Sequence, residues 1–232
     1  MKNAIILCSG GLDSVVTANY VKKKLKYDKL IVLFFDYGQR NVKQERKASQ
    51  LCAKSLNSEF RELKLSELGK ISTSMLNSKE KARKISRKNL KNTSKESANW
   101  YVPCRNTIFL IYALAIAESE FIKSKRKFEI FTGFKNEGKE PFPDATQEFV
   151  EEMNRLQKVS IDKGIRIIAP LIKMDKEDIV KLGVELGVKL ENTFSCYVGA
   201  KNLHCGYCLA CKLRKEGFYW AGVKDLTKYK EK

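Results

Sequence analysis

The residues Ser9-Gly10-Gly11-Leu12-Asp13-Ser14 follow a short apolar run over residues 3–8 (NAIILC) and precede a helical pattern from Asp13 to about Leu25. The apolar run is typical of a buried strand, so the six residues form the turn between a first strand and a first helix. Two glycines let the backbone approach an anion closely, and the amides of a helix N-terminus favour negative charge. Ser9 and Ser14 add hydroxyl donors. The sequence therefore predicts an anion-binding loop here.

Asp13 is unusual in a phosphate site, because it adds a second negative charge. It fits there if it caps the following helix or holds a cation that the phosphates share. The alternative is a plain glycine-rich turn with a capping Asp. Gly133–Lys139 comes nearest to the mononucleotide loop that carries a Lys, but Glu140 follows where that loop has Ser or Thr, and no helix is predicted there.

Strand-like and helical patterns alternate along the rest of the chain. Strands are expected at 30–35, 60–65, 128–132 and 166–169, and helices at 42–56, 106–122, 144–161 and 176–186. Residues 30–35 (LIVLFF) are all apolar, as in a parallel sheet that is covered on both faces. This order predicts an α/β fold with a doubly wound, Rossmann-like parallel sheet.

The composition fits a folded enzyme-sized domain. The chain has 232 residues, of which 43% are hydrophobic, enough for one substantial domain and a small appendage. No run of ~18 apolar residues is present, so we expect no membrane-spanning helix. The start, MKNAIILCSGG, leads into the loop where a signal-peptide cleavage site would have to lie. Seven cysteines, three of them scattered, argue against a disulfide framework and for a reducing cytoplasm.

The chain is strongly basic, with 45 Lys and Arg against 27 Asp and Glu and a formal charge of +18. Lys is much the commoner of the two cations, whereas phosphate and base recognition favours the Arg fork, so we expect no nucleic-acid partner. Part of the charge lies in Leu76–Lys95, which holds eight basic residues and one acid. Such a run predicts a solvated loop, with a polyanion contact as the alternative.

Four cysteines near the C-terminus have the spacing C-x8-C-x2-C-x2-C: Cys196, Cys205, Cys208 and Cys211. Four thiolates on short loops are what a tetrahedral Zn²⁺ site needs, and a closed four-Cys shell leaves no open position for catalysis. We expect one structural zinc ion per chain, with an iron–sulfur cluster as the alternative and His204 beside the ligands. The change of character at Cys196 predicts a main domain over 1–195 and a small helical, zinc-binding module over 196–232.

The glycine-rich loop matches SGGxDS at all five fixed positions, and in this context it resembles the PP-loop ATP pyrophosphatases. Together with the loop, four further segments resemble the 7-cyano-7-deazaguanine synthase family over nearly the whole chain: FDYGQR (35–40), VPCRN (102–106), FPD (142–144) and CGYCLAC (205–211) with Arg214. The resemblance implies a PP-loop ATPase domain with a zinc-bearing tail, paired as a homodimer. It also implies an activity that converts 7-carboxy-7-deazaguanine, ATP and ammonia into the 7-nitrile, a precursor of modified tRNA bases in queuosine- or archaeosine-type biosynthesis.

That activity is chemically coherent. A carboxylate is a poor electrophile, and transfer of AMP to its oxygen both neutralises it and creates a leaving group. Ammonia then gives the amide, and a second adenylation permits dehydration to the nitrile. The protein would chiefly position ATP and stabilise the pyrophosphate charge, so no covalent nucleophile is needed. Free ammonia is the expected nitrogen source.

The resemblance implies which residues form the site. Those that would bind ATP, with Mg²⁺ neutralising its phosphates, are Leu7, Cys8, Ser9, Gly10, Gly11, Leu12, Asp13, Ser14, Asp36, Tyr37, Gln39 and Arg40. Those that would bind the acid are Arg105, Asn106, Phe142 and Asp144, and those that would act in catalysis are Ser9, Asp13, Ser14 and Arg105. Asp144 would pair with the guanidine-like edge of a deazaguanine, or would instead cap the helix that follows it.

The chain departs from the family pattern on the acceptor side. Asn41 stands where the family commonly has His, Cys104 where it often has Gly, and Ala145-Thr146 where it commonly has Cys-Arg. Adenylation is therefore better supported than the nitrile end point. The alternatives are a related enzyme that stops at the amide or uses another amine, a tRNA-thiolating PP-loop enzyme, and a nucleotide-binding regulator without catalysis.

Overall fold

The computed structural model describes residues 2–78, 80–87, 90, 93–135, 142–161, 163–199 and 203–230. Its centre is one sheet of five parallel strands in the order β3-β2-β1-β4-β5. The strands are β1 (Asn3–Leu7), β2 (Lys29–Asp36), β3 (Glu59–Lys64), β4 (Phe128–Phe131) and β5 (Ile167–Ile168). The predicted doubly wound α/β fold is confirmed.

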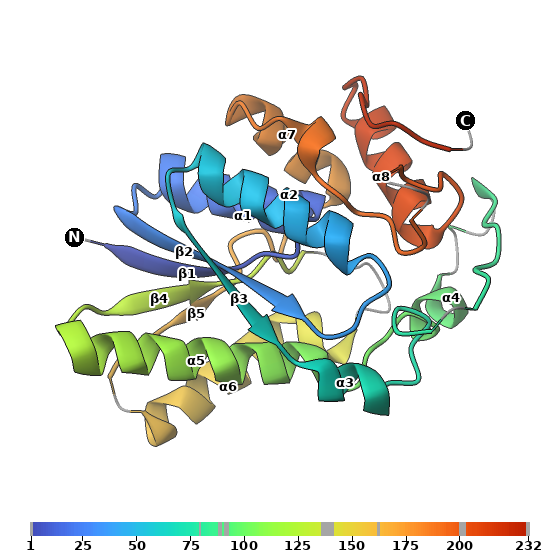
Figure 1. Cartoon of the computed structure of the whole chain (residues 1–232). Coiled ribbons are helices and arrows are strands. Elements are labelled where there is room, and N and C mark those ends of the chain that lie inside the picture. The colour runs from blue at the N-terminus through green and yellow to red at the C-terminus, as the bar shows by residue number, and fades with distance from the viewer. Residues whose placement is uncertain are drawn as a thin grey trace.

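Helices cover both faces of this sheet, so the domain has three layers (Figure 1). One face carries α1 (Leu12–Lys23) and α2 (Val42–Ser55), and α7 (Lys176–Glu185) packs against α1. The other face carries α5 (Arg105–Ser124) and α6 (Gln147–Ser160). The shorter α3 (Ser66–Ile71) and α4 (Ser94–Ala98) and the C-terminal α8 (Leu209–Trp220) lie toward the carboxyl ends of the strands.

The strand order places a binding crevice at one edge of the sheet. The chain moves outward from β1 to β2 and β3, then returns to the other side of β1 with β4 and β5. Such a reversal leaves a crevice outside the carboxyl ends of the strands on either side of it, here β1 and β4. The glycine-rich loop follows β1, so it lies at this crevice.

The central strands owe their stability to burial on both faces. The side chains of β2 from Leu30 to Phe35 are all buried, which is why this stretch carries no alternation of polar residues. Ile5 in β1 and Ile130 in β4 are fully buried and pack in the same core cluster as the α5 residues Leu110 and Ala113. The sheet and α5 therefore form the rigid base on which the carboxyl-edge loops stand.

The helix predicted from Asp144 begins later than expected. A 3₁₀ turn occupies Pro143–Ala145, and α6 starts at Gln147. Thr146 is the N-cap, since its hydroxyl accepts a hydrogen bond of 3.0 Å from the Phe149 amide. The interpretation of Asp144 as the cap of this helix is therefore wrong.

The basic segment 76–95 is not uniformly solvated. Residues 79, 88, 89, 91 and 92 lie outside the described part of the chain. Within the described part, Leu76 and Ile85 are buried, and the Ile85 amide donates 3.1 Å to the Tyr207 carbonyl. These two side chains fasten the segment to the body of the protein, a pattern that its charge run conceals.

The C-terminal residues pack directly on the main sheet domain. Phe194, before the proposed boundary, and Ala48 of α2 belong to the same buried cluster as the four cysteines. Helix α8 packs along α7. The division into 1–195 and 196–232 stays a prediction.

In the described residues, no helix has the length and apolarity that would be needed to cross a membrane.

Gly10 lies where the loop after β1 passes closest to α2. Its φ of +77° is in the left-handed region that favours glycine, and a Cβ there would come within 2.6 Å of the Glu45 carbonyl and 2.7 Å of the Ala48 Cβ. Gly11 differs, because its backbone is extended and a Cβ would meet the Ser9 hydroxyl only at 3.3 Å.

We expect Gly10→Ala to lower the free energy of unfolding by about 2–4 kcal/mol, through backbone strain and overpacking against α2. The matched variant Gly11→Ala should lower it by less than about 1 kcal/mol. Urea denaturation followed by circular dichroism measures both. Equal losses in the two variants would contradict this account of the loop.

Candidate functional site

The loop after β1 leaves the start of α1 available to an anion. Gly11 is the N-cap of α1 and has no side chain of its own that could accept from the first helix amides. The Ser9 and Ser14 hydroxyls lie 3.4 Å apart, and that of Ser14 also donates to the Gly11 carbonyl at 3.1 Å. The two hydroxyls thus lie together at the positive end of the α1 dipole, an arrangement compatible with the predicted binding of phosphate.

Three residues predicted in the same loop have largely covered side chains. Cys8 and Leu12 are buried, and Leu7 is partly buried against the core. Any contact of Cys8 or Leu12 with a nucleotide would therefore come from backbone atoms. A hydrogen bond with Cys52 lowers the pKa of the buried Cys8 thiol to about 6.

Asp13 is held by a lysine from a distant part of the chain. Both of its carboxylate oxygens lie 2.7 Å from the Nζ of Lys176, the first residue of α7. Asp13 is not the cap of α1, so that interpretation is wrong. Sequence reasoning missed Lys176, although a cation in the first turn of a helix, where the dipole disfavours it, is a signal that could have found it.

The loop after β2 has an internal network of its own. The side chain of Gln39 is buried; its Nε2 donates to the Phe35 carbonyl at 2.9 Å and its Oε1 accepts from the Tyr37 amide at 2.9 Å. Asp36 pairs with Arg46 at 2.8 Å. Arg40 donates to the Glu80 carbonyl at 3.0 Å. The side chains of Gln39 and Arg40 hold the loop in shape, and their predicted contact with ATP stays a prediction.

The predicted acid-binding residues meet where α5 begins. The Arg105 guanidinium lies over the Tyr37 ring, 5.9 Å from its centroid, and donates to its hydroxyl at 3.4 Å. The buried Asp144 accepts from the Asn106 amide at 3.3 Å, while the Asn106 side chain donates to the Asp144 carbonyl at 2.9 Å. Burial raises the pKa of Asp144, and the charge of Arg105 opposes that rise.

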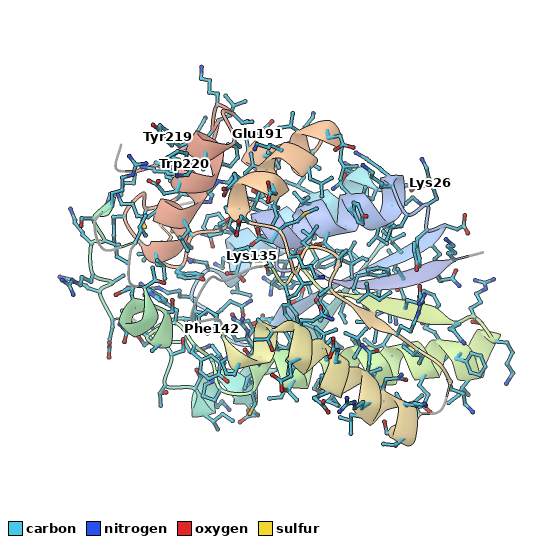
Figure 2. All side chains as sticks on the ribbon, turned by 180° about the vertical axis from the view of Figure 1, so that it is seen from behind. Lys26, Lys135, Phe142, Glu191, Tyr219 and Trp220 are labelled. Carbon is cyan, nitrogen blue, oxygen red and sulfur yellow. The ribbon has the colours of Figure 1, made fainter. Side chains whose placement is uncertain are left out.

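Two aromatic rings flank this group. Tyr101 and Phe142 are stacked, with centroids 5.9 Å apart and an interplanar angle of 13°. Figure 2 shows Phe142 and Lys135 on the side of the molecule away from Lys26, which marks the opposite end of the sheet. Flat faces beside a buried carboxylate and a guanidinium suit a planar, polar heterocycle.

The three departures from the family pattern have local structural roles. Cys104 has φ +55°, in the region that favours glycine, which is the residue the family often has there. Thr146 caps α6. Asn41 donates 2.8 Å to the Cys196 carbonyl and so links the loop after β2 to the cysteine cluster. Thr146 stands where the family commonly has Arg, and among the described residues of this network Arg105 is the cation whose charge acts on Asp144.

The four predicted cysteine ligands come together as one buried cluster. The Sγ atoms of Cys196, Cys205, Cys208 and Cys211 all lie within 4.8 Å of one another. Three backbone amides donate to them, from Gly199 and Cys205 to Cys196 and from Cys208 to Cys205, at 3.1–3.3 Å. Such donors stabilise thiolates, and four thiolates in a closed shell fit a structural metal ion. His204 is no ligand here, since its Nε2 accepts from the Ser195 amide at 3.1 Å.

Residues 193–196 connect this cluster to the loop after β1. The Phe194 amide donates to the Gly10 carbonyl at 2.8 Å, and the Leu12 amide donates to the Ser195 hydroxyl at 3.4 Å. Arg214 of α8, which is almost fully buried, donates to the Thr193 and Ser195 hydroxyls at 2.7 and 3.2 Å. The 193–196 segment is therefore a brace between the cysteine cluster and the loop.

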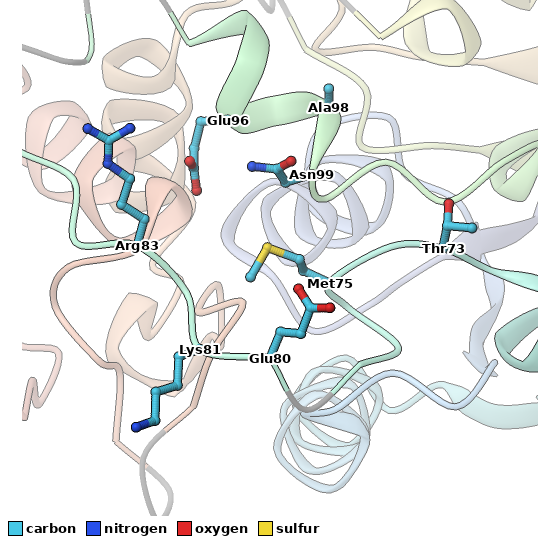
Figure 3. A pocket seen from close by; sticks show the side chains of 8 residues that line it. All are labelled: Thr73, Met75, Glu80, Lys81, Arg83, Glu96, Ala98 and Asn99. Carbon is cyan, nitrogen blue, oxygen red and sulfur yellow. The ribbon is translucent and has the colours of Figure 1, made fainter.

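A separate cavity of about 590 Å³ lies between the segment after α3 and α4 (Figure 3). It is lined by Thr73, Met75, Glu80, Lys81, Arg83, Glu96, Ala98 and Asn99. None of the residues predicted to bind ATP or the acid lines it. Its acidic and basic side chains alternate, so it offers no single sign of charge to a ligand.

The family model for the queuosine biosynthesis protein QueC matches residues 3–222. Similar curated proteins are the 7-cyano-7-deazaguanine synthases of Nitratiruptor sp. (38% identity over 229 residues, 98% of each chain) and Methanosphaera stadtmanae (37% over 231 residues, 98% of each chain). The solved NMN synthetase of Francisella tularensis covers 97% of this chain and 78% of its own at 15% identity and a TM-score of 0.49, too low to bear on the site. The loop after β1, the residue group at the start of α5 and the cysteine cluster thus occur in a chain that belongs to the QueC family.

Proposed function

We propose that this protein is an ATP-dependent carbon–nitrogen ligase that converts 7-carboxy-7-deazaguanine and ammonia into 7-cyano-7-deazaguanine. The acid would first be adenylated and aminated, and the amide would then be adenylated and dehydrated. The observation that carries the proposal is the SGGLDS loop at the start of α1 and the carboxyl edge of the sheet, in a chain that matches QueC over residues 3–222.

On the ATP side, the loop would hold the phosphates that leave as pyrophosphate. Ser9, Gly10, Gly11 and Ser14 would supply donors, and bound Mg²⁺ would neutralise the phosphate charge. Lys176 lies within reach of the loop through its pair with Asp13. A polyphosphate in the loop would compete with Asp13 for this cation, so Lys176 would stabilise the charge that builds up on the leaving pyrophosphate.

On the acceptor side, Asp144 and Arg105 would divide the recognition of the substrate. The carboxylate of Asp144 would accept two hydrogen bonds from the guanidine-like edge of the deazapurine. Arg105 would bind the substrate carboxylate and, later, the acyl-adenylate. Phe142, with Tyr101 stacked on it, would cover a face of the heterocycle.

The remaining expectations concern the context of the enzyme. Zn²⁺ is the metal that a closed set of four thiolates favours, and it would be structural. We also propose a homodimer in the cytoplasm.

An enzyme that stops at the amide, or uses a different amine, would share the ATP side described here. A tRNA-thiolating enzyme would need a cysteine at the site that can carry sulfur. The candidate for that role is Cys104, an exposed free cysteine that directly precedes Arg105 in the sequence.

The direct test is turnover of 7-carboxy-7-deazaguanine with MgATP and ammonium, followed by mass spectrometry with AMP and pyrophosphate monitored. We expect the nitrile, with two AMP released per product because each adenylation consumes one ATP. Amide without nitrile would move the end point, and absence of AMP release with this acid would contradict the substrate assignment.

Replacing Lys176 by Met should raise the KM for ATP about 10- to 100-fold, because a charge-assisted contact to phosphate is lost. Steady-state kinetics of pyrophosphate release measures this. Lys173→Met, which removes an exposed lysine three residues earlier, is the control and should leave the KM unchanged. An unchanged KM in the Lys176 variant would show that the lysine serves Asp13 alone.

A further inference from the structure

Glu45 is a carboxylate at the site that the sequence motifs did not single out. It lies in the first turn of α2, which starts beyond the carboxyl end of β2 (Figure 1). Its backbone carbonyl is packed so closely on Gly10 that a Cβ there would come within 2.6 Å of it. Glu45 therefore borders the phosphate loop from the side of α2.

One oxygen of this carboxylate is fixed and the other is open. The Oε2 of Glu45 accepts a hydrogen bond of 3.0 Å from Gln39, whose amide is itself locked by Phe35 and Tyr37. Among the residues that the structure describes, no hydrogen bond reaches Oε1. The geometry is that of an oriented carboxylate with a free lone pair, and the immobile Gln39 supplies the orientation.

The other acids of this edge are already engaged. Asp13 is paired with Lys176 and Asp36 with Arg46, both at less than 3 Å, and Asp144 accepts from the Asn106 amide. Glu45 has no ion pair of this kind in the described part of the chain. Glu45 is therefore the carboxylate at this edge that is available to accept a proton during the reaction.

The charged and titratable groups around Glu45 set that affinity. Burial raises its pKa to about 7, the hydrogen bond from Gln39 and the charge of Arg105 oppose the rise, and the charge of Asp36 adds to it. Tyr37, the remaining neighbour, stays neutral, because burial raises its pKa to about 12. A base whose pKa lies near the working pH is the most effective in proton transfer.

Amide formation from an acyl-adenylate requires such a base. The nitrogen lone pair of ammonia forms the new C–N bond, the C–O bond to the AMP phosphate breaks, and its electron pair leaves with AMP. The attacking nitrogen becomes cationic and must lose one proton before the amide is neutral. Asp13, Asp36 and Asp144 are poorly suited to take it, since each is held by the partner named above.

We propose that Glu45 is the general base that accepts this proton, through its open Oε1, when ammonia attacks the adenylated acid. The proposal rests on the proposed function and adds a catalytic residue to it. The proton then passes to solvent, which regenerates the carboxylate for the second half of the reaction. There the O-adenylated amide loses both of its N–H protons, and its C–O bond to AMP breaks with the electron pair leaving on AMP, as the nitrile forms.

The test compares wild type, Glu45→Gln and the control Glu67→Gln, which alters an exposed glutamate of α3. Two rates are measured: carboxylate-dependent exchange of pyrophosphate into ATP, and amide formation at a fixed concentration of free ammonia from about pH 6 to 9. In wild type the amide rate should rise through about pH 7 as Glu45 ionises and then level off. In Glu45→Gln it should fall about 10²- to 10⁴-fold and lose this step, with exchange kept within about threefold.

Two results would overturn the proposal. If Glu45→Gln forms amide at the wild-type rate with the same pH profile, Glu45 is not the base. If exchange falls as far as amide formation, Glu45 serves adenylation or the loop instead. Failure of the proposed function is recognised separately, because it would show as absent exchange in wild type and in the Glu67→Gln control.

Discussion

The hydrogen bond from the Phe194 amide to the Gly10 carbonyl is the contact on which the site depends. Gly10 has a left-handed backbone, which glycine adopts without steric cost, and it packs between α2 on one side and the 193–196 segment on the other. That segment ends at Cys196, the first residue of the cysteine cluster. The shape of the loop after β1 is therefore set in part by residues that lie far from it in the sequence.

The charges at the carboxyl edge follow from this construction. A doubly wound sheet brings the ends of β1, β2 and β4 to one crevice, and the segments after them supply acids and cations in pairs. An acid that is paired with a cation costs little free energy in the unliganded protein. The phosphates of a ligand can then compete with that acid for the cation. This is how a site of ordinary polar residues can stabilise charge without a covalent nucleophile.

Local patterns were enough to predict the sheet, the loop and the four cysteines. Each depends on residues close in sequence: an apolar run, two glycines before a helix, or a short Cys spacing. The contact between Lys176 and Asp13 spans 163 positions, and that between Asn41 and Cys196 spans 155, so no local pattern indicates them. The start of α6 was misplaced because Asp144 and Thr146 are both good capping residues, and only the tertiary contact with Asn106 decides between them. Glu45 was missed because its properties also depend on tertiary structure. Its carboxylate is oriented by Gln39, and burial raises its pKa.

The most direct measurement is the affinity for MgATP, by isothermal titration calorimetry, of the protein with and without the metal ion proposed for its cysteine cluster. Circular dichroism would establish that the sheet stays folded after chelation. The account predicts that the Kd weakens at least about tenfold, or about 1.4 kcal/mol, because the 193–196 segment no longer holds Gly10. An equal Kd in the two forms would contradict it and would show that the cluster only fastens the tail.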